Sequence, residues 1–389
     1  MKELEEYLNS KIGLTNNKNL EALHRFFTED QLNSLMDKTI AIVGTNGKTS
    51  TANFIFNLLG KEEKQVLMFT SPHLVSFQER IQSHSNINFD YISRIVHDFE
   101  IENNITLGYF ETLFLIACKA FLDNEMDYFI CEAGIGGVLD TTSIIQSKNV
   151  VLTNIGRDHQ DLLGYTDLEV LDQKIFVSNS IDNLFVGNLS DELIKVIENN
   201  YKHFNSKYFL NDFVDGKSKD FTSNQINYLL ASWVVNFLIS SSTKKITADF
   251  NKEYVEGRFE IINRNPLKIL DGAHNIDGFI KTIEDYEKVY SLEDTHLYLG
   301  FKNGKKIENI IRYLKSKKQY KLNFIEENTF YNQQSPDKFI DYLETENIDY
   351  KIVELSTFSS NKNPSILLGS LYLIGEYKKR ITTWKHFLW

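Results

Sequence analysis

Residues 40–56 read "IAIVGTNGKTSTANFIF", in which an apolar run meets a loop with glycines and then a second apolar segment. An apolar run at 39–43 is typical of a buried strand, and the apolar residues of 49–60 recur at helical spacing. The segment 44–50 between them contains two glycines and a lysine. Glycines let backbone N–H groups approach phosphate oxygens, and a helix N-terminus favours the same anion. The stretch therefore predicts a phosphate-binding loop.

The chemistry of this loop supports the prediction more than its length does. The segment "GTNGKTS" is shorter than the common eight-residue pattern, so the strand before it and the helix after it are the main support. Lys48 can reach the β and γ phosphates of a nucleotide, and Thr49 or Ser50 can hold Mg²⁺. An ordinary Gly-rich turn is the alternative. The loop alone leaves the reaction open, because kinases, GTPases, motors and ligases share it.

Composition sets limits on the class of protein. The chain has 389 residues, is 42% hydrophobic and 24% charged, and carries a formal net charge of −11. Such an acidic chain lacks the overall basic character of a nucleic-acid-binding protein. We expect no signal peptide, since the start "MKELEEYLNS" is acidic, and no membrane span, since no run of about 18 apolar residues occurs. Cys118 and Cys131 lie in apolar stretches and are expected to be buried free thiols.

Apolar strands alternate with helices along the chain. Short helices are expected within 1–36, and longer ones at 49–60, 89–103, 110–123 and 223–240. Strands are expected at 39–43, 65–69, 127–132, 149–153, 267–270, 295–301, 321–326 and 350–355. This alternation predicts right-handed crossovers and mostly parallel sheets. We therefore expect an α/β protein with two domains, 1–264 and 265–389, and Pro266 near their boundary.

Four polar residues of the predicted first domain are candidates for a functional site. Ser71 comes after a strand, where open sheets bind ligands, although a Ser-Pro turn explains it equally well alone. Glu132 ends a strand before a Gly-rich turn and is placed to bind Mg²⁺, or it faces solvent. His159 could be a metal ligand, a proton handler or a structural residue. Lys174 lies in a predicted helix, where a lysine is normally a solvated surface charge.

The predicted second domain begins with a further polar turn. "EGRFEIINRNPLKILDGAHNIDG" (256–278) contains a strand and then the turn that ends in His274 and Asn275. Asp271 could accept hydrogen bonds from a ribose or a base, although Asp-Gly alone is a turn signal. Arg258 lies near the domain boundary.

Together these motifs resemble one enzyme family. They occur in the order found in folylpolyglutamate synthases and dihydrofolate synthases, which belong to the wider group of Mur-type, ATP-dependent amide ligases. The matching segments are "GTNGK", "TSPHLVSFQERI", "YFE", "EAGIGGVLDTT", "TNIGRDHQDLLGYT", "GRFE", "DGAHN" and "LLGSLYLIGEYKK". The loop "GTNGK" would fit any Mur-type ligase, whereas "TSPHLVSFQERI" and "DHQDLLGYT" select the folate branch. The resemblance runs from about residue 40 to 379.

The resemblance implies a fold and a reaction. The fold is an N-terminal P-loop ATPase domain with a mostly parallel sheet, followed by a smaller Rossmann-like α/β domain. The family uses ATP to convert a carboxylate into an acyl phosphate, which the amine of glutamate attacks to form an amide. The implied partners are pteroate or folate, L-glutamate and ATP with Mg²⁺, and K⁺ is implied as an activator. A cytoplasmic monomer that binds neither nucleic acid nor membrane is expected.

The resemblance also assigns roles to residues by position. The catalytic set is Lys48, Glu132, His159 and Lys174, of which Lys174 matches a lysine that is carbamylated in many relatives. The ATP-binding set is Gly44, Thr45, Asn46, Gly47, Lys48, Thr49, Ser50, Arg258, Asp271, His274 and Asn275. The metal set is Thr49, Ser50, Ser71, Glu132 and His159. The folate set is Ser71, Pro72, His73, Tyr109 and Phe110, in which aromatic faces could stack on the pterin.

The chain also departs from the family pattern. Thr49 follows the loop lysine where the folate branch often has Gly, Gly108 stands for the Thr of "TYFE", and Val138 stands for an Arg. Ser143 replaces an Asn, the segment 175–177 replaces "xGI", and the family's "DKD" appears as "KNGKK" (302–306). These departures keep two alternatives open. One is a non-catalytic paralogue that binds nucleotide or folate, and the other is a Mur-type ligase with a different acceptor.

Overall fold

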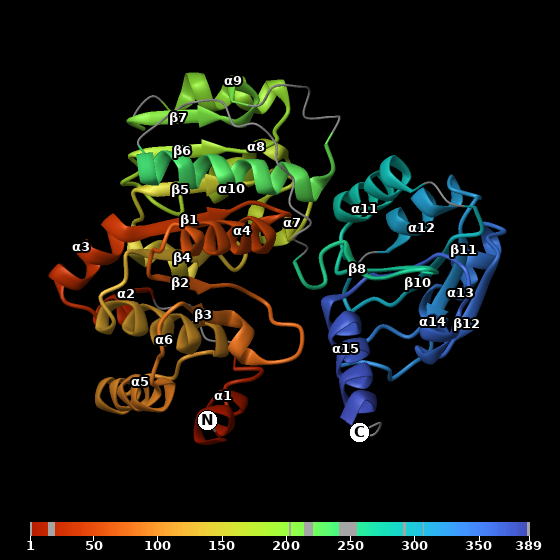
Figure 1. Ribbon diagram of the computed structural model, residues 1–389, viewed down its shortest axis with the longest axis horizontal. Helices are drawn as coiled ribbons and strands as arrows, with labels where there is room; N and C mark the ends of the chain where they lie inside the picture. The colour runs from red at the N-terminus through yellow and green to blue at the C-terminus, as the bar shows by residue number, and fades with distance from the viewer. Residues whose placement is uncertain are drawn as a thin grey trace. The chain divides into compact units, whose positions relative to one another are not determined.

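The structure is a computed structural model that describes residues 2–14, 20–201, 204–213, 221–240, 255–290, 293–305 and 307–386. The chain forms two compact units (Figure 1). Of the described residues, the second unit holds 72–76, 222–224 and all those from 255 onward, and the first unit holds the rest. Two short segments that are distant in sequence therefore belong to the second unit.

The first unit is built on a seven-stranded sheet. Its strands run in the order β3-β2-β4-β1-β5-β6-β7, and all neighbours are parallel except β2 and β3. The strands are β1 (Thr39–Val43), β2 (Val66–Phe69), β3 (Ile81–Ser83), β4 (Tyr128–Glu132), β5 (Asn149–Leu152), β6 (Asn183–Val186) and β7 (Ser206–Phe209). The predicted strands at 39–43, 65–69, 127–132 and 149–153 are confirmed within one residue at each end.

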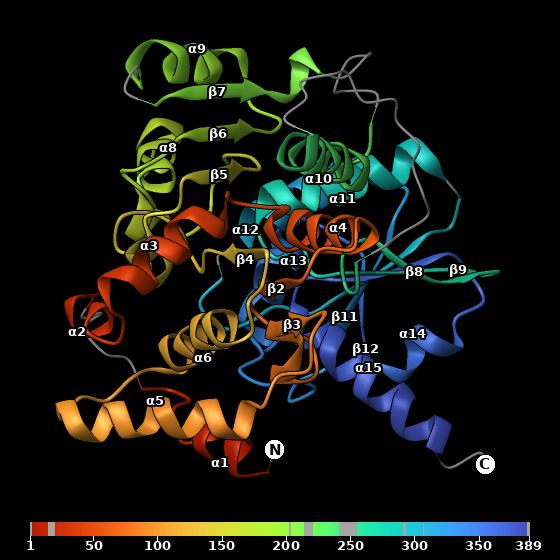
Figure 2. The ribbon, with the colours of Figure 1, turned by 60° about the vertical axis from the view of Figure 1, so that its left-hand side comes forward.

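Helices cover both faces of this sheet, as right-handed crossovers require. They are α1 (Lys2–Asn9), α2 (Leu20–His24), α3 (Glu29–Lys38), α4 (Lys48–Lys61), α5 (Phe89–Asn103), α6 (Tyr109–Asp123), α7 (Gln160–Leu163), α8 (Asp167–Ile175), α9 (Asp191–Asn200) and α10 (Ser223–Ser240). Figure 2 shows α4 and α10 on one face and α6 and α8 on the other. No helix in the described residues is long and apolar enough to span a membrane.

Alternating side chains of the strands supply the core of the first unit. Leu67, Phe69 and Phe129 pack in one apolar cluster with residues of α6, whereas Ile42 is fully buried on the opposite face of its strand. Sheet residues that are buried on both faces are typical of a parallel sheet between helices. Cys118 and Cys131 are buried and unpaired, as predicted.

The second unit is built on a six-stranded sheet of order β12-β11-β10-β13-β9-β8, parallel except for the hairpin β8–β9. Its strands are β8 (Glu260–Arg264), β9 (Leu267–Asp271), β10 (His296–Leu299), β11 (Lys321–Ile325), β12 (Tyr350–Val353) and β13 (Ser365–Leu368). Its helices are α11 (Ile276–Val289), α12 (Glu308–Lys315), α13 (Asp337–Thr345), α14 (Ser356–Ser360) and α15 (Leu371–His386). The predicted α/β fold with mostly parallel sheets is confirmed.

The boundary predicted at 264–265 falls between the two strands of the β8–β9 hairpin. Because β8 pairs with β9, residues 255–264 belong to the second unit in the structure. The sequence pattern favours a later boundary, since the apolar strand at 267–270 is the first clear signal after the helix at 223–240.

Candidate active site

The carboxyl ends of neighbouring parallel strands gather the predicted phosphate and metal residues of the first unit. Ile42 of β1 pairs in register with Glu132 of β4, and Val43 pairs with Leu152 of β5. The loop after β1 therefore begins beside Glu132. Polar groups after parallel strands meet at one edge of the sheet, which is where open α/β sheets bind ligands.

The phosphate loop leads directly into helix α4. Gly47 precedes the helix with φ +82°, a left-handed conformation that favours glycine. A Cβ atom on Gly47 would also lie 2.6 Å from Oδ1 of Asn227 in α10, so the loop has no room for a side chain there. The backbone N–H of Asn46 donates to Oδ1 of Asn154 at 2.9 Å. The predicted strand–loop–helix arrangement of a phosphate site is present.

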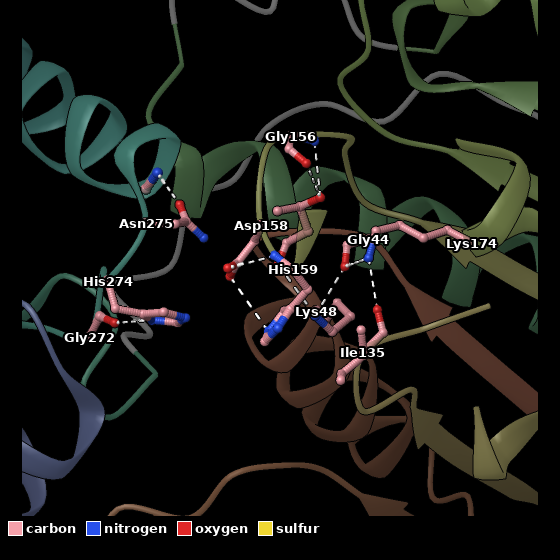
Figure 3. A network of polar contacts seen from close by, with 12 residues as sticks. Gly44, Lys48, Ile135, Gly156, Asp158, His159, Lys174, Gly272, His274 and Asn275 are labelled. Atoms are coloured by element: carbon pink, nitrogen blue, oxygen red, sulfur yellow. Dashed lines mark hydrogen bonds and ion pairs between the residues drawn. The ribbon is translucent and has the colours of Figure 1, made fainter. Parts of the chain in front are cut away.

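Two lysines converge on the same loop carbonyl. Lys48 Nζ donates to the oxygen of Gly44 at 3.0 Å and to that of Thr45 at 3.3 Å. Lys174 Nζ donates to the oxygens of Gly44 and Ile135, each at 2.9 Å (Figure 3). Both ammonium groups therefore sit at the phosphate loop, where they suit an anion.

Lys174 is buried rather than solvated. Only 2% of the residue is exposed, so the interpretation of Lys174 as a surface charge is wrong. Burial, together with the positive charge of Lys48, lowers the pKa of Lys174 to about 7. The sequence could not reveal the burial of Lys174, because its ammonium group contacts carbonyl oxygens of loops that lie 39 and 130 residues away in the chain.

Glu132 is a buried carboxylate beside the first turn of α4. It is 2% exposed, so the alternative of a solvent-facing side chain is wrong. The hydroxyl of Thr49 donates to both of its carboxylate oxygens, at 3.0 and 3.1 Å. The backbone N–H of Ser71 donates to Oε2 at 3.1 Å. The structure thus brings together Thr49, Ser71 and Glu132 of the predicted metal set, and Ser50 is buried in the same first turn of α4.

His159 is more exposed than Glu132 and Lys174. It precedes α7 with φ +49°, and its side chain is 43% exposed. Its Nε2 lies 3.9 Å from Oδ2 of Asp158, and its backbone N–H donates to Oδ1 of the same residue. Within the described residues, no three His, Cys, Asp or Glu side chains form a metal-binding group. A metal site here would depend on hydroxyl oxygens beside Glu132.

Asp140 shapes the Gly-rich loop that faces Lys174, and the sequence prediction missed it. Its carboxylate is 2% exposed and accepts from the backbone N–H groups of Ile135 (3.0 Å), Gly136 (2.9 Å) and Thr142 (3.1 Å). Its negative charge also opposes the lowering of the pKa of Lys174. The Asp-Thr-Thr turn at 140–142 was the available signal, since Asp at such a position accepts from nearby N–H groups.

The four predicted nucleotide residues of the second unit gather around one turn. Asp271 accepts from the N–H of Phe259 at 2.8 Å and from that of Ala273 at 2.7 Å, and its burial raises its pKa. The Arg258 guanidinium opposes that rise. His274 Nδ1 contacts the oxygen of Gly272 at 2.9 Å (Figure 3), and Asn275 caps α11 by accepting from the N–H of Gly278 at 2.7 Å.

The predicted folate residues fall into two groups. Tyr109 and Phe110 start α6 in the first unit, where the Arg80 guanidinium lies 5.0 Å from the Tyr109 ring centre. The Phe110 ring packs at 5.3 Å from that of Phe69. Pro72 and His73 belong to the second unit, whereas Ser71 belongs to the first.

The pattern of a known protein family matches the part of the chain that contains loop 44–50 and Glu132. The pattern of the Mur ligase middle domain matches residues 42–263, which is more than half of the chain. The chain therefore belongs to the Mur ligase family.

The chain is similar to folate enzymes of that family. It is 28% identical over 337 residues to the dihydrofolate synthase/folylpolyglutamate synthase of Buchnera aphidicola subsp. Schizaphis graminum, covering 80% of this chain and 79% of the relative. Folylpolyglutamate synthase of Mycobacterium tuberculosis, complexed with ADP, shares its fold with a TM-score of 0.79 at 19% identity, over 97% of each chain. The bifunctional Yersinia pestis enzyme complexed with AMPPNP and Mn ion has a TM-score of 0.76 at 18% identity, over 98% of each chain.

These matches confirm the predicted resemblance and the predicted fold. They also confirm the predicted class of enzyme, an ATP-dependent ligase. The related structures hold nucleotide and, in one case, a divalent metal, in agreement with the predicted cofactors.

Proposed function

We propose that the chain joins L-glutamate to the carboxylate of dihydropteroate, of a reduced folyl glutamate, or of both. The observation that carries this proposal is the cluster of Lys48, Thr49, Glu132 and Lys174 around one loop. A carboxylate and a triphosphate repel each other, so a ligase that joins them needs cations and dipoles placed in advance. The cluster supplies these groups at a helix N-terminus.

The phosphate end of ATP would lie against the loop 44–50. Lys48 Nζ now donates to two loop carbonyls and would turn to the β and γ phosphates when they arrive. The first N–H groups of α4 point out of the helix and can donate to the same oxygens. Arg258, Asp271, His274 and Asn275 are the nucleotide-binding residues that we propose for the second unit.

The residues of the predicted metal set fit Mg²⁺. This ion prefers oxygen ligands, and the hydroxyl of Thr49 lies 3.0 Å from the carboxylate of Glu132. Thr49, Ser50, Ser71 and Glu132 would hold the ion, with His159 as a further candidate ligand. When bound, Mg²⁺ would neutralise charge on the γ-phosphate during its transfer.

Lys174 has the chemistry that carbamylation requires. A lysine with a pKa near 7 is partly a neutral amine at neutral pH, and only that form attacks carbon dioxide. The new N–C bond forms as one C=O π bond opens, and the nitrogen loses one proton to solvent. The product is a carbamate anion beside Gly44 that could bind a metal. Carbamylation of Lys174, activation by K⁺, a monomeric state and a cytoplasmic location stay predictions.

The acceptor would bind near the start of α6. Tyr109 offers an aromatic face that is already paired with the Arg80 guanidinium, and a pterin or benzoate ring suits such a face. The guanidinium also suits a carboxylate.

An acceptor panel tests the proposal. ADP release is measured with L-glutamate and, in turn, dihydropteroate, tetrahydrofolate, a cell-wall peptide precursor or no acceptor. We expect release that requires glutamate and one of the two pterin acceptors, with a product heavier by one glutamyl residue. Turnover with the peptide alone would establish a Mur-type ligase of different specificity. ATP binding without turnover under any condition would favour the non-catalytic alternative.

A further inference from the structure

A buried carboxylate ties the N-terminal segment to the helices behind the proposed acceptor site. Glu100 of α5 is 5% exposed and accepts two hydrogen bonds from Lys11 Nζ, at 2.6 and 2.8 Å. The hydroxyl of Tyr7 in α1 also donates to it. A buried ion pair is stable only when its remaining hydrogen-bonding groups have partners, and Tyr7 is such a partner for Glu100. Figures 1 and 2 both show α1 beside α5.

The same carboxylate holds the residue that leads into α6. The backbone N–H of Leu107 donates to Glu100 Oε1 at 2.6 Å. The next residue, Gly108, caps α6, and its N–H donates to Glu111 at 2.7 Å. Glu100 therefore fixes the position of the helix start through one hydrogen bond to the chain.

Residue 108 is a glycine with little room for a side chain. A Cβ atom at Gly108 would lie 3.2 Å from the carbonyl oxygen of Leu14 and 2.4 Å from Glu111 Oε2. The φ of −78° would suit any residue, so space and not backbone conformation favours glycine. Glu111 and, at a longer distance, Leu14 of the segment held by Lys11 thus limit the room for a larger side chain at 108.

The two residues after Gly108 are those proposed to bind the acceptor. Tyr109 carries the Arg80 guanidinium on its ring, and Phe110 packs on Phe69 with its ring 3.2 Å from the Cβ position of Gly134. A shift of the α6 start would move both rings. The contacts of the two rings named here are with Arg80, Phe69 and Gly134, which lie outside the loop 44–50, so we expect such a shift to change acceptor binding more than ATP binding.

We infer that Tyr7, Lys11 and Glu100 are positioning residues that set the acceptor affinity of this enzyme. The inference rests on the proposed function, since it assigns Tyr109 and Phe110 to the acceptor. Removal of the lysine leaves Glu100 buried without its counter-charge, and the carboxylate must then recruit water or release Leu107. Release of Leu107 frees the start of α6 and misplaces the acceptor rings.

The test compares Lys11→Met with Lys11→Arg and Tyr7→Phe in the full chain. We expect Lys11→Met to raise the KM for the pterin acceptor about tenfold, the equivalent of one lost stacking contact, while the KM for ATP stays unchanged. Lys11→Arg should restore most of the acceptor affinity, because it restores the charge. Tyr7→Phe should raise the acceptor KM less, because it removes one hydrogen bond.

Lys119→Met is the matched control. Lys119 pairs with Asp123 on α6 itself, four residues apart and partly exposed. We expect this variant to keep both KM values. Equal changes in the KM for ATP and for the acceptor in Lys11→Met, with Tyr7→Phe unchanged, would overturn the inference and indicate a general role in stability. Absence of turnover in the unmodified enzyme would instead refute the proposed function.

Discussion

Substitution of Lys174 by Met should change how the stability of the first unit depends on pH. In the folded protein, burial and the charge of Lys48 lower the pKa of Lys174 from 10.5 to about 7. The unfolded chain then binds more protons than the folded chain between pH 7 and 10.5. The free energy of unfolding therefore rises with pH in this window, and the Met variant loses that rise.

The expected size follows from the two pKa values. One proton difference changes the free energy of unfolding by about 1.4 kcal/mol per pH unit. Between pH 7.5 and 9.5 the lysine is mostly neutral in the folded state and charged in the unfolded state. The unmodified protein should therefore gain about 2 to 3 kcal/mol relative to Lys174→Met over this interval.

Urea unfolding in CO₂-free buffer measures this difference. Trp233 is fully buried in α10 of the first unit, so its fluorescence reports on that unit. Both proteins are compared with Trp384 and Trp389 changed to Phe, which leaves Trp233 as the single reporter. Parallel pH profiles of the two proteins would refute the argument that Lys174 is a buried, largely neutral amine near pH 8.

Three further predictions concern the site. Lys48→Ala should lower kcat by at least about 100-fold in the ADP-release assay, because it removes a donor that stabilises charge in the transition state. The circular dichroism spectrum should stay unchanged, and near-normal turnover would contradict the role of Lys48. Glu132→Gln should raise the Mg²⁺ concentration for half-maximal ADP release at least about tenfold, since it removes the one carboxylate of the predicted metal set, and an unchanged Mg²⁺ titration would remove Glu132 from that set. Lys174→Ala should regain part of its activity with added small carboxylates if a carbamate is the working form, and no response would leave carbamylation unsupported.

The strand, loop and helix of residues 39–61 could be predicted because their signals are local. The strand, the two glycines, the lysine and the helix are adjacent in sequence, and each has its own physical signature. Glu132 and Ser71 could also be placed, since both end or follow strands that the apolar pattern reveals, and parallel strands bring their carboxyl ends together.

Other features depend on contacts that no local pattern encodes. The burial of Lys174 comes from carbonyls of two distant loops, and Asn227 faces Gly47 only because α10 packs beside α4. Strands β6 and β7 were not predicted; β7 has one buried residue and lacks the apolar run that marks β2 and β5. The assignment of β8 to the second unit likewise required its pairing with β9.

Activation of the acceptor carboxylate by ATP can be followed by the transfer of oxygen-18 from that carboxylate to phosphate. The acceptor that supports turnover is labelled with oxygen-18 in its carboxylate and converted with L-glutamate and ATP. An acyl phosphate passes one of these oxygens to phosphorus, and the amine of glutamate then expels it. We predict that each inorganic phosphate released carries one oxygen-18 atom. Unlabelled phosphate, formed together with the glutamyl product, would contradict the account.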